Sequence, residues 1–128
     1  MPRVKQLVVS HENLPGMLAS IAKVLGNGNV NILSFFTMMS GATGTTYLVV
    51  DNIEKARKAL SSARLTYTET DALRLELPNT PGALAGFASK IAQEDINITL
   101  GYLTSVKRSK KASIVLAVSD LDKADRIR

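Results

Sequence analysis

The sequence predicts an α+β protein made of two ferredoxin-like β-α-β-β-α-β units in tandem, with the helices of each unit on one face of an antiparallel sheet. The main observation is an internal repeat, in which residues 14–32 return 66 positions later as residues 80–98. A gapless repeat across a loop, a helix and the start of a strand indicates a duplicated folding unit. We therefore expect a first domain over residues 1–70 and a second over residues 71–128.

Each unit opens with a strand and a turn. Residues 4–10 are rich in β-branched side chains, and residues 73–77 alternate between apolar and polar, so both segments are predicted strands. Each is soon followed by Pro-Gly. We expect Pro15 and Pro81 to take the first position of a helix, where a missing N–H costs nothing. Thr80 is then expected to cap the second of these helices.

The segments that follow carry one apolar stripe each. Its members recur at i, i+3, i+4 and i+7, which predicts a helix that lays one face on a sheet. They are Leu18, Ile21, Ala22 and Leu25 in the first unit and Leu84, Phe87, Ala88 and Ile91 in the second. Gly26-Asn27-Gly28 is expected to end the first helix. The second unit has Glu94-Asp95 there, which predicts a slightly longer helix.

A strand hairpin and a second helix come next in each unit. The strands are expected at residues 31–39 and 47–50 in the first unit and at residues 97–106 and 114–118 in the second. The second helices begin near Asn52 and Asp120. Residues 65–70 supply a fourth strand to the first unit. The chain reaches Arg128 inside the last helix, so we expect the second unit to lack a fourth strand, which leaves its neighbour open to pairing with another chain.

Composition restricts the classes of function. The chain has no cysteine and one histidine, which excludes a disulfide framework and a thiolate metal site, and we expect no metal and no cofactor. No signal peptide and no apolar run near 20 residues is present, so we expect a soluble cytoplasmic protein without membrane contact. A unit of about 60 residues buries only ~60% of its unfolded surface. We therefore expect packing between units or chains, in a homodimer or higher homo-oligomer.

A basic cluster lies between two predicted strands of the second unit. It consists of Lys107, Arg108, Lys110 and Lys111. Most such clusters are solvated loops, and the alternatives are nucleic acid or an acidic partner. Residues 1–70 carry seven Lys or Arg and four Asp or Glu, and residues 71–128 carry nine and seven. Because the net charges of +3 and +2 are nearly even, no basic arm stands out, and we do not expect a nucleic-acid partner.

The order of motifs resembles the ACT domain, a small regulatory module that binds amino acids. The resemblance rests on a strand, Asn-x-Pro-Gly, an amphipathic helix and then Val/Ile-Asn-Ile, and it covers both units. The first unit is similar to the serine-binding regulatory domain of phosphoglycerate dehydrogenase through residues 11–16 and 30–32. The resemblance assigns ligand binding to His11, Asn13, Leu14, Pro15, Gly16, Asn31, Asn79, Thr80, Pro81, Gly82 and Asn97.

In that family the ligand lies between two domains placed side by side. If the two units pair within one chain, the resemblance implies that His11 and Asn13 face Asn97. Asn79 would then face Asn31. If units pair between chains instead, His11 and Asn13 would face Asn31. The second unit has leucine where the first has His11, so we expect two unequal sites.

The residue types suit a free amino acid without reference to any family. Unpaired N–H groups at a helix N-terminus and the helix dipole favour a carboxylate. The glycines after Pro15 and Pro81 let the backbone approach a ligand closely. Asparagine offers both a donor and an acceptor, and His11 could add a donor. The alternative is structural: Asn13 and Asn79 would only organise a turn, and His11 would be a partly exposed residue at a strand end.

These observations predict a regulatory protein that binds an amino acid and is not an enzyme. No Ser–His–acid set or P-loop is present, and Glu12 and His11 lie on opposite faces of a strand. A first alternative is a regulatory subunit of a separate amino-acid biosynthetic enzyme, which makes a regulated enzyme a further partner. A second alternative is an RNA-binding module of the same topology. Tyr67 and Tyr102 are present for that role, but no aromatic-rich RNA-binding motif surrounds them.

Overall fold

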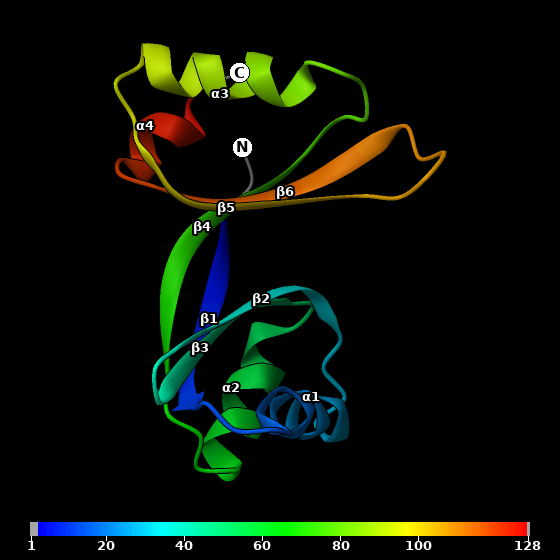
Figure 1. Cartoon of the computed structure of the whole chain (residues 1–128), viewed down its shortest axis with the longest axis vertical. Coiled ribbons are helices and arrows are strands. Elements are labelled where there is room, and N and C mark those ends of the chain that lie inside the picture. The colour runs from blue at the N-terminus through cyan, green and yellow to red at the C-terminus, as the bar shows by residue number, and fades with distance from the viewer. Residues whose placement is uncertain (1–2, 128) are drawn as a thin grey trace. The chain divides into compact units, whose positions relative to one another are not determined.

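The computed structural model describes residues 3–127, and these fold into two compact units (Figure 1). The first unit comprises residues 5–70. The second comprises residues 71–127 together with Arg3 and Val4 at the start of the chain. Each unit has its own helices on one face of its own strands, and the two units are described separately below.

The first unit has the expected β-α-β-β-α-β order, and its strands follow one another across the sheet as β2-β3-β1-β4. β3 pairs antiparallel with both β1 and β2. Its elements are β1 (Arg3–Glu12), α1 (Met17–Asn27), β2 (Ile32–Ser40), β3 (Thr43–Val50), α2 (Ile53–Ser62) and the start of β4 (Tyr67–Pro78). β2 is the edge strand of this unit.

The second unit repeats this arrangement, with antiparallel strands in the order β4-β6-β5. Its elements are the end of β4, α3 (Ala83–Gln93), β5 (Ile98–Ser105), β6 (Lys111–Val118) and α4 (Leu121–Asp125). The expected strands and helices are therefore confirmed in both units. None of the four helices in the described residues is long and apolar enough to span a membrane.

No strand follows α4 among the described residues, and the prediction that the second unit lacks a fourth strand stays a prediction. Arg3 and Val4, the first described residues of β1, belong to this unit, and β1 is the neighbour of β4. The Arg3 guanidinium forms ion pairs with Asp122 and Asp125 of α4, the latter at 3.4 Å between Nε and Oδ2. Arg3 and Val4 are thus tied to α4 of the second unit.

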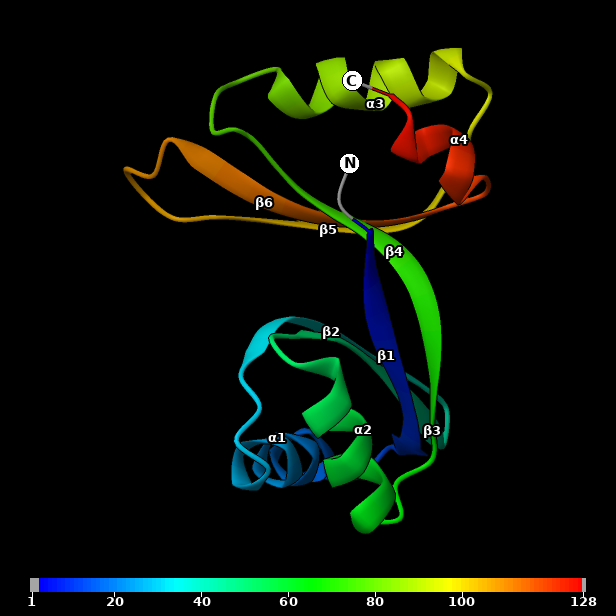
Figure 2. The same cartoon turned by 180° about the vertical axis from the view of Figure 1, so that it is seen from behind.

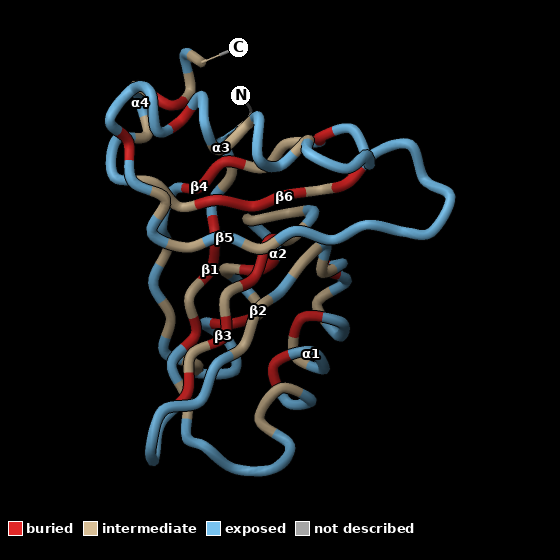
Figure 3. The backbone as a smooth tube through the Cα atoms, turned by 45° about the horizontal axis from the view of Figure 1, so that its top comes forward, coloured by how far each residue is buried: buried red, intermediate tan, exposed pale blue. Residues whose placement is uncertain are grey.

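The core of the first unit lies between its sheet and its helices. Leu7, Ile21, Leu25, Leu48 and Leu60 are fully buried there, and Figure 3 shows the buried residues of α1 on one side of the helix. Burying apolar surface of this kind is the main term that stabilises a fold. The second unit has a matching core around Leu73, Ile91, Ile96 and Ala124.

The apolar stripes predicted for α1 and α3 are correct only in part. Ile21, Leu25 and Ile91 are buried, whereas Ala22 is exposed and Leu84 keeps 47% of its surface exposed. In α1 the buried face runs instead through Val24, which packs against the core.

Both of these helices begin two residues later than predicted. Gly16 and Gly82 precede them with φ angles of 88° and 85°, and neither helix has a side-chain cap. The backbone N–H of Ala83 donates to the carbonyl of Thr80 at 3.3 Å, which closes a turn with Pro second and Gly third. A type II turn needs a positive φ at its third residue, which glycine adopts without strain. The prediction of Pro15 and Pro81 at the first helical position, with Thr80 as a cap, is therefore wrong.

The two helices have equal length, so the longer second helix is also a wrong prediction. α1 and α3 each contain 11 residues. After them Asn29 and Asp95 adopt φ angles of 60° and 57°. Asn and Asp tolerate the left-handed region better than other side chains, so Glu94-Asp95 ends a helix as the glycine-rich segment does.

The second helix of each unit starts where the sequence predicts. Asn52 and Asp120 are the caps, and their side chains accept hydrogen bonds from the backbone N–H groups three residues later, at 3.1 and 3.0 Å. Arg57 of α2 also donates two hydrogen bonds of 2.8 Å to the carboxylate of Glu69 on β4. These bonds and the nearby negative charges raise the pKa of Arg57 above its usual value. They tie α2 to the last strand of its unit.

Candidate functional site

The loop between β1 and α1 is held to the β2–β3 hairpin by one asparagine. The side-chain amide of Asn13 donates to the carbonyl of Gly41 at 2.9 Å, and its backbone N–H donates to the carbonyl of Ala42 at 3.0 Å. The side-chain oxygen of Asn13 has no partner among the described residues. Asn13 therefore fixes the loop and keeps one free acceptor.

The loop between β4 and α3 is held in the same way. The side-chain amide of Asn79 donates to the carbonyl of Ser109 at 2.9 Å, and its backbone N–H donates to the carbonyl of Lys110 at 2.9 Å. The recurrence of asparagine at these two positions thus has a structural cause in both units. The organising role that we considered for Asn13 and Asn79 is present in the structure, and it leaves their side-chain oxygens available.

The loops that Asn13 and Asn79 hold lead into helix starts with unpaired N–H groups. In α1 the first backbone bond into the helix runs from the N–H of Ser20 to the carbonyl of Gly16, at 2.9 Å. The N–H groups of residues 17–19 have no acceptor in the part of the chain that the structure describes. Leu14, Pro15 and Gly16, like their counterparts in the second unit, are exposed at these helix starts. Each helix start can therefore accept an anionic group.

A polar cluster lies beside this loop in the first unit. His11 is half-buried, and its Nδ1 and Nε2 atoms lie 2.9 Å from the carbonyl oxygen of Glu12 and 2.8 Å from Oγ1 of Thr46. Oγ1 of Thr46 lies 2.8 Å from Oγ1 of Thr37. We call these three side chains, His11, Thr37 and Thr46, the polar cluster. Thr46 is fully buried, so its hydrogen bonds matter for stability.

The proton positions in the polar cluster follow from its chemistry. The carbonyl of Glu12 can only accept, so Nδ1 of His11 carries a proton and donates. In the neutral ring Nε2 is then an acceptor, and the Thr46 hydroxyl donates to it. Thr46 in turn accepts from the hydroxyl of Thr37. Both ring nitrogens therefore have protein partners, and a ligand that contacts either nitrogen must replace one of these bonds.

The close contacts of His11 depend on Gly44. Gly44 faces His11 across β1 and β3 and Met39 across β2 and β3. A Cβ atom at Gly44 would lie 2.7 Å from Cε1 of His11 and would also meet the sulfur of Met39. The missing side chain therefore gives the imidazole its place on the helix-facing side of the sheet.

The second unit fills the same positions with aliphatic side chains. Leu77 faces Ala112 as His11 faces Gly44, and Leu103 faces Ile114 as Thr37 faces Thr46. The counterparts of His11, Thr37 and Thr46 are thus Leu77, Leu103 and Ile114. Leu77 and Ile114 belong to an apolar cluster with Leu116.

Sequence reasoning found His11 and missed its partners. The strand registers show that the β5–β6 hairpin has two more residues than the β2–β3 hairpin between equivalent strand pairs. Beyond the hairpins the two units therefore match at an offset of 68 and no longer at 66. Thr46 corresponds to Ile114 only after this correction, which the strand registers supply. The sequence offered one signal for this cluster. Thr46 occupies an inward position of β3, where the next inward residue is the buried Leu48.

The other predicted asparagines lie beyond the far ends of α1 and α3. The backbone N–H of Asn31 donates to Oδ1 of Asp51 at 3.0 Å, and that of Asn97 donates to Oγ of Ser119 at 2.9 Å. Their side-chain amides are exposed and have no hydrogen-bond partner among the described residues. Within one unit, Asn13 and Asn31 are separated by the length of α1, which is about 16 Å for 11 residues.

A single unit therefore brings His11 and Asn13 together and leaves Asn31 apart. The same holds for Asn79 and Asn97 in the second unit. The predicted facing of His11 and Asn13 with Asn97, and of Asn79 with Asn31, joins residues of different units and stays a prediction.

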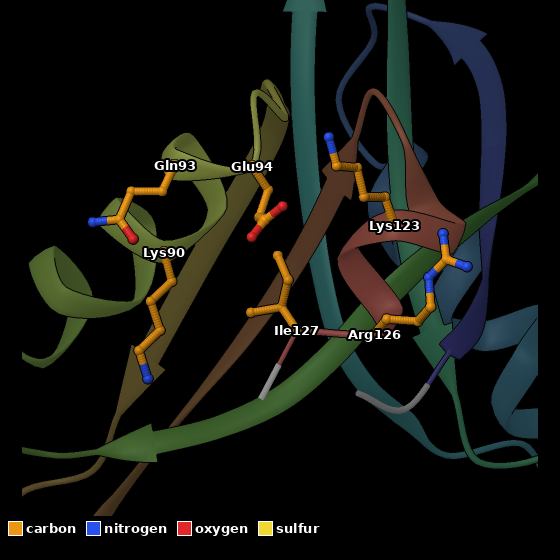
Figure 4. A pocket seen from close by; sticks show the side chains of 6 residues that line it. All are labelled: Lys90, Gln93, Glu94, Lys123, Arg126 and Ile127. Atoms are coloured by element: carbon orange, nitrogen blue, oxygen red, sulfur yellow. The ribbon is translucent and has the colours of Figure 1, made fainter.

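A surface hollow of about 420 Å³ in the second unit lies between the end of α3 and α4. It is lined by Lys90, Gln93, Glu94, Lys123, Arg126 and Ile127. Figure 4 shows the amino groups of Lys90 and Lys123 pointing in different directions, so they do not converge on one anion. Among the described residues no group of three His, Asp or Glu side chains could hold a metal ion.

Comparisons with known proteins bear on the fold. No protein-family model matches the sequence, and a search of curated proteins finds no match. The crystal structure of protein BT0572 from Bacteroides thetaiotaomicron is similar over 96% of this chain and 84% of that chain, with 28% identity and a TM-score of 0.90. The ligand-free regulatory subunit of aspartate kinase from Thermus thermophilus is similar over 95% of this chain and 87% of that chain, with 14% identity and a TM-score of 0.68.

This chain has an ACT-like fold. A further match, to the aspartokinase alpha and beta subunits, covers 97% of this chain and 88% of that chain at 15% identity, with a TM-score of 0.63. At such identities the likeness to the aspartate kinases speaks for the fold alone. The two ACT-like units share the loops that Asn13 and Asn79 hold and differ in the polar cluster, which is confined to the first.

Proposed function

We propose that this chain is a regulatory protein that binds a free amino acid at the β1–α1 loop of its first ACT-like unit and catalyses no reaction. The observation that carries the proposal is the combination found there. Unpaired helix N–H groups, the free side-chain oxygen of Asn13 and the polar cluster all belong to this loop or to the strands and helix that border it. The second unit has the first two of these features and lacks the third.

Each ligand group finds a matching partner in this arrangement. The N–H groups of residues 17–19 suit the carboxylate, because the helix dipole adds to their hydrogen bonds. The side-chain oxygen of Asn13 suits the ammonium group. His11 suits a small polar side chain that replaces one of its two protein hydrogen bonds. The resemblance of the first unit to a serine-binding domain makes serine the first ligand to test.

A second copy of the chain would complete the site. β2 is the edge strand of its unit, and it exposes the apolar side chains of Leu33, Phe35, Met38 and Met39. An edge of this kind favours pairing with another strand. If β2 pairs antiparallel with its own copy, the start of one strand meets the end of the other. The partner's Asn31 then comes beside Gly41, whose carbonyl holds Asn13.

A closely related candidate is a regulatory subunit of a separate amino-acid biosynthetic enzyme. The observation that favours it is the similarity to the regulatory subunit of aspartate kinase, which covers 95% of this chain. In this version the ligand changes the affinity of the chain for an enzyme, with a coupling of about 1–3 kcal/mol. An RNA-binding module is less well supported, because Tyr67 packs against the core and is not free to stack on a base.

A melting-temperature screen against all proteinogenic amino acids tests the proposal. A ligand at 100 times its dissociation constant adds about 2.7 kcal/mol to the free energy of unfolding, which is a shift of several degrees in a chain of this size. We expect Asn13→Ala to lose the shift. Asn79→Ala is the matched control, because it removes the same structural hydrogen bond from the second unit. A flat response across the panel at millimolar concentration would refute the proposal.

A further inference from the structure

The hairpin between β5 and β6 carries a concentration of positive charge. Both views of the fold show the tip of this hairpin extending past α3 (Figures 1 and 2). Asn79 holds the turn through the carbonyls of Ser109 and Lys110, and the N–H of Ser109 donates to the carbonyl of Val106 at 2.9 Å. The hydroxyl of Ser109 donates to the carbonyl of Lys111 at 2.9 Å. The turn is therefore fixed by hydrogen bonds within it and from Asn79.

The side chains on this turn are cations without partners. All residues from 105 to 111 are exposed, and residues 96–119 include no Asp or Glu. No ion pair of Lys107, Arg108, Lys110 or Lys111 occurs within the described residues. The corresponding turn of the first unit, Gly41-Ala42, carries no charge. The four cations are thus a feature added to one copy of a duplicated fold, and they are available to an external polyanion.

The composition of the turn distinguishes between kinds of polyanion. Protein interfaces are depleted in lysine and enriched in aromatic residues, and this turn has three lysines and no aromatic residue. Single-stranded nucleic acid is held largely by stacking on aromatic side chains, which are also missing here. Lysine and arginine on a two-stranded ribbon match the phosphates along the major groove of B-form DNA, which is wide enough to admit a β-ribbon.

We propose that the β5–β6 hairpin binds duplex DNA through its phosphate backbone, without reading the base sequence. This goes beyond the proposed amino-acid site, which lies in the other unit and does not depend on it. Four phosphate contacts predict a slope of about −3.6 for the logarithm of the association constant against the logarithm of salt concentration. Affinity should then fall roughly 100-fold between 50 and 200 mM salt.

The test is fluorescence anisotropy of a labelled 20-base-pair duplex at several salt concentrations. The test variant replaces the four cations together, as Lys107→Gln, Arg108→Asn, Lys110→Gln and Lys111→Gln. The control removes the same charge from exposed positions on three helices, as Lys23→Gln, Lys55→Gln, Lys58→Gln and Lys90→Gln. We expect the hairpin variant to lose binding and its salt slope, the control to keep both, and the melting temperature of the hairpin variant to stay unchanged.

Three outcomes would overturn the proposal. The first is no binding of the unmodified chain to the duplex at 50 mM salt and 100-fold excess protein. The second is an equal loss of binding in the hairpin variant and the control, which would assign binding to net charge alone. The third is tighter binding to poly-glutamate, to vesicles of anionic phospholipid or to duplex RNA than to duplex DNA. A chain that loses its amino-acid response and still binds DNA would separate this proposal from the preceding one.

Discussion

The two units of this chain hold their first helix in the same way but fill the space beside it differently. Asn13 and Asn79 each donate one side-chain hydrogen bond of 2.9 Å to a hairpin carbonyl. Next to Asn13 the first unit buries the hydroxyl of Thr46 against His11, whereas the second unit has Leu77 and Ile114 at these positions. The asparagine-held loop is thus common to both units, whereas the polar cluster occurs in the first unit alone.

This difference separates the features that both copies of the fold have from the feature that only one copy has. Burying polar groups costs free energy unless every one is hydrogen-bonded, and an aliphatic filling avoids that requirement. The second unit shows that the fold accepts leucine and isoleucine here. The fold of a unit therefore does not require the polar cluster, and we propose that the cluster serves binding at the helix start beside it.

The largest expected effect concerns what the two units share. Leu25 and Ile91 occupy matching places on α1 and α3, and both are fully buried. Leu25→Ala and Ile91→Ala should each lower the free energy of unfolding by about 2–5 kcal/mol, because each leaves a cavity in a close-packed core. Urea titration followed by circular dichroism measures the change. A loss below about 1 kcal/mol in one unit alone would show that the two cores are not equivalent.

The next effect compares the polar cluster of the first unit with the aliphatic side chains at the same positions of the second unit. Thr46→Val keeps the shape of the side chain and removes the hydroxyl that bonds to His11 and Thr37. Nε2 of His11 then loses its partner, while the Thr37 hydroxyl keeps only the carbonyl of Thr45 at 3.5 Å. The free energy of unfolding should therefore fall by about 1–3 kcal/mol. Ile114→Val at the matching position should cost only about 0.5–1.5 kcal/mol.

Chemical denaturation of both variants tests this contrast. If Thr46→Val is no more costly than Ile114→Val, the polar cluster is not hydrogen-bonded as described.

A smaller effect concerns the asparagine hydrogen bonds that hold the β1–α1 and β4–α3 loops to their hairpins. Asn13→Ala and Asn79→Ala each remove one side-chain hydrogen bond to a backbone carbonyl. Each should reduce the free energy of unfolding by about 1 kcal/mol, and by the same amount, since the bonds have equal length and similar exposure. Paired thermal melts provide the comparison. Unequal losses would mean that the two loops are not held alike.

Much of the fold could be predicted from the sequence, because its signals are local and occur twice. Hydrophobic periodicity and the repeat located the strands, the helices and the loops that contain Asn13 and Asn79. The helix starts were misplaced, because Pro-Gly suits both the first turn of a helix and a type II turn. In the structure Pro-Gly forms the turn, and Gly16 has a φ of 88°.

The remaining errors come from pairings between distant parts of the chain. That Arg3 and Val4 group with the second unit depends on strand pairing across about 70 residues, which no local pattern reports. The polar cluster was hidden because the unequal hairpins shift the repeat by two positions beyond them. Only the register of Thr37 with Thr46 reveals it. The sequence identified His11 as a candidate site residue but did not identify Thr37 and Thr46 as the other members of its cluster.

The most direct test replaces the polar cluster of the first unit with the aliphatic side chains that the second unit has at the same positions. The variant is His11→Leu, Thr37→Leu and Thr46→Ile, studied beside the unmodified chain in a melting-temperature screen of amino acids. We predict that the unmodified chain is stabilised by at least one amino acid, and that the variant is equally or more stable alone but responds to none. A variant that keeps the full ligand-induced shift, or an unmodified chain without one, would contradict the account.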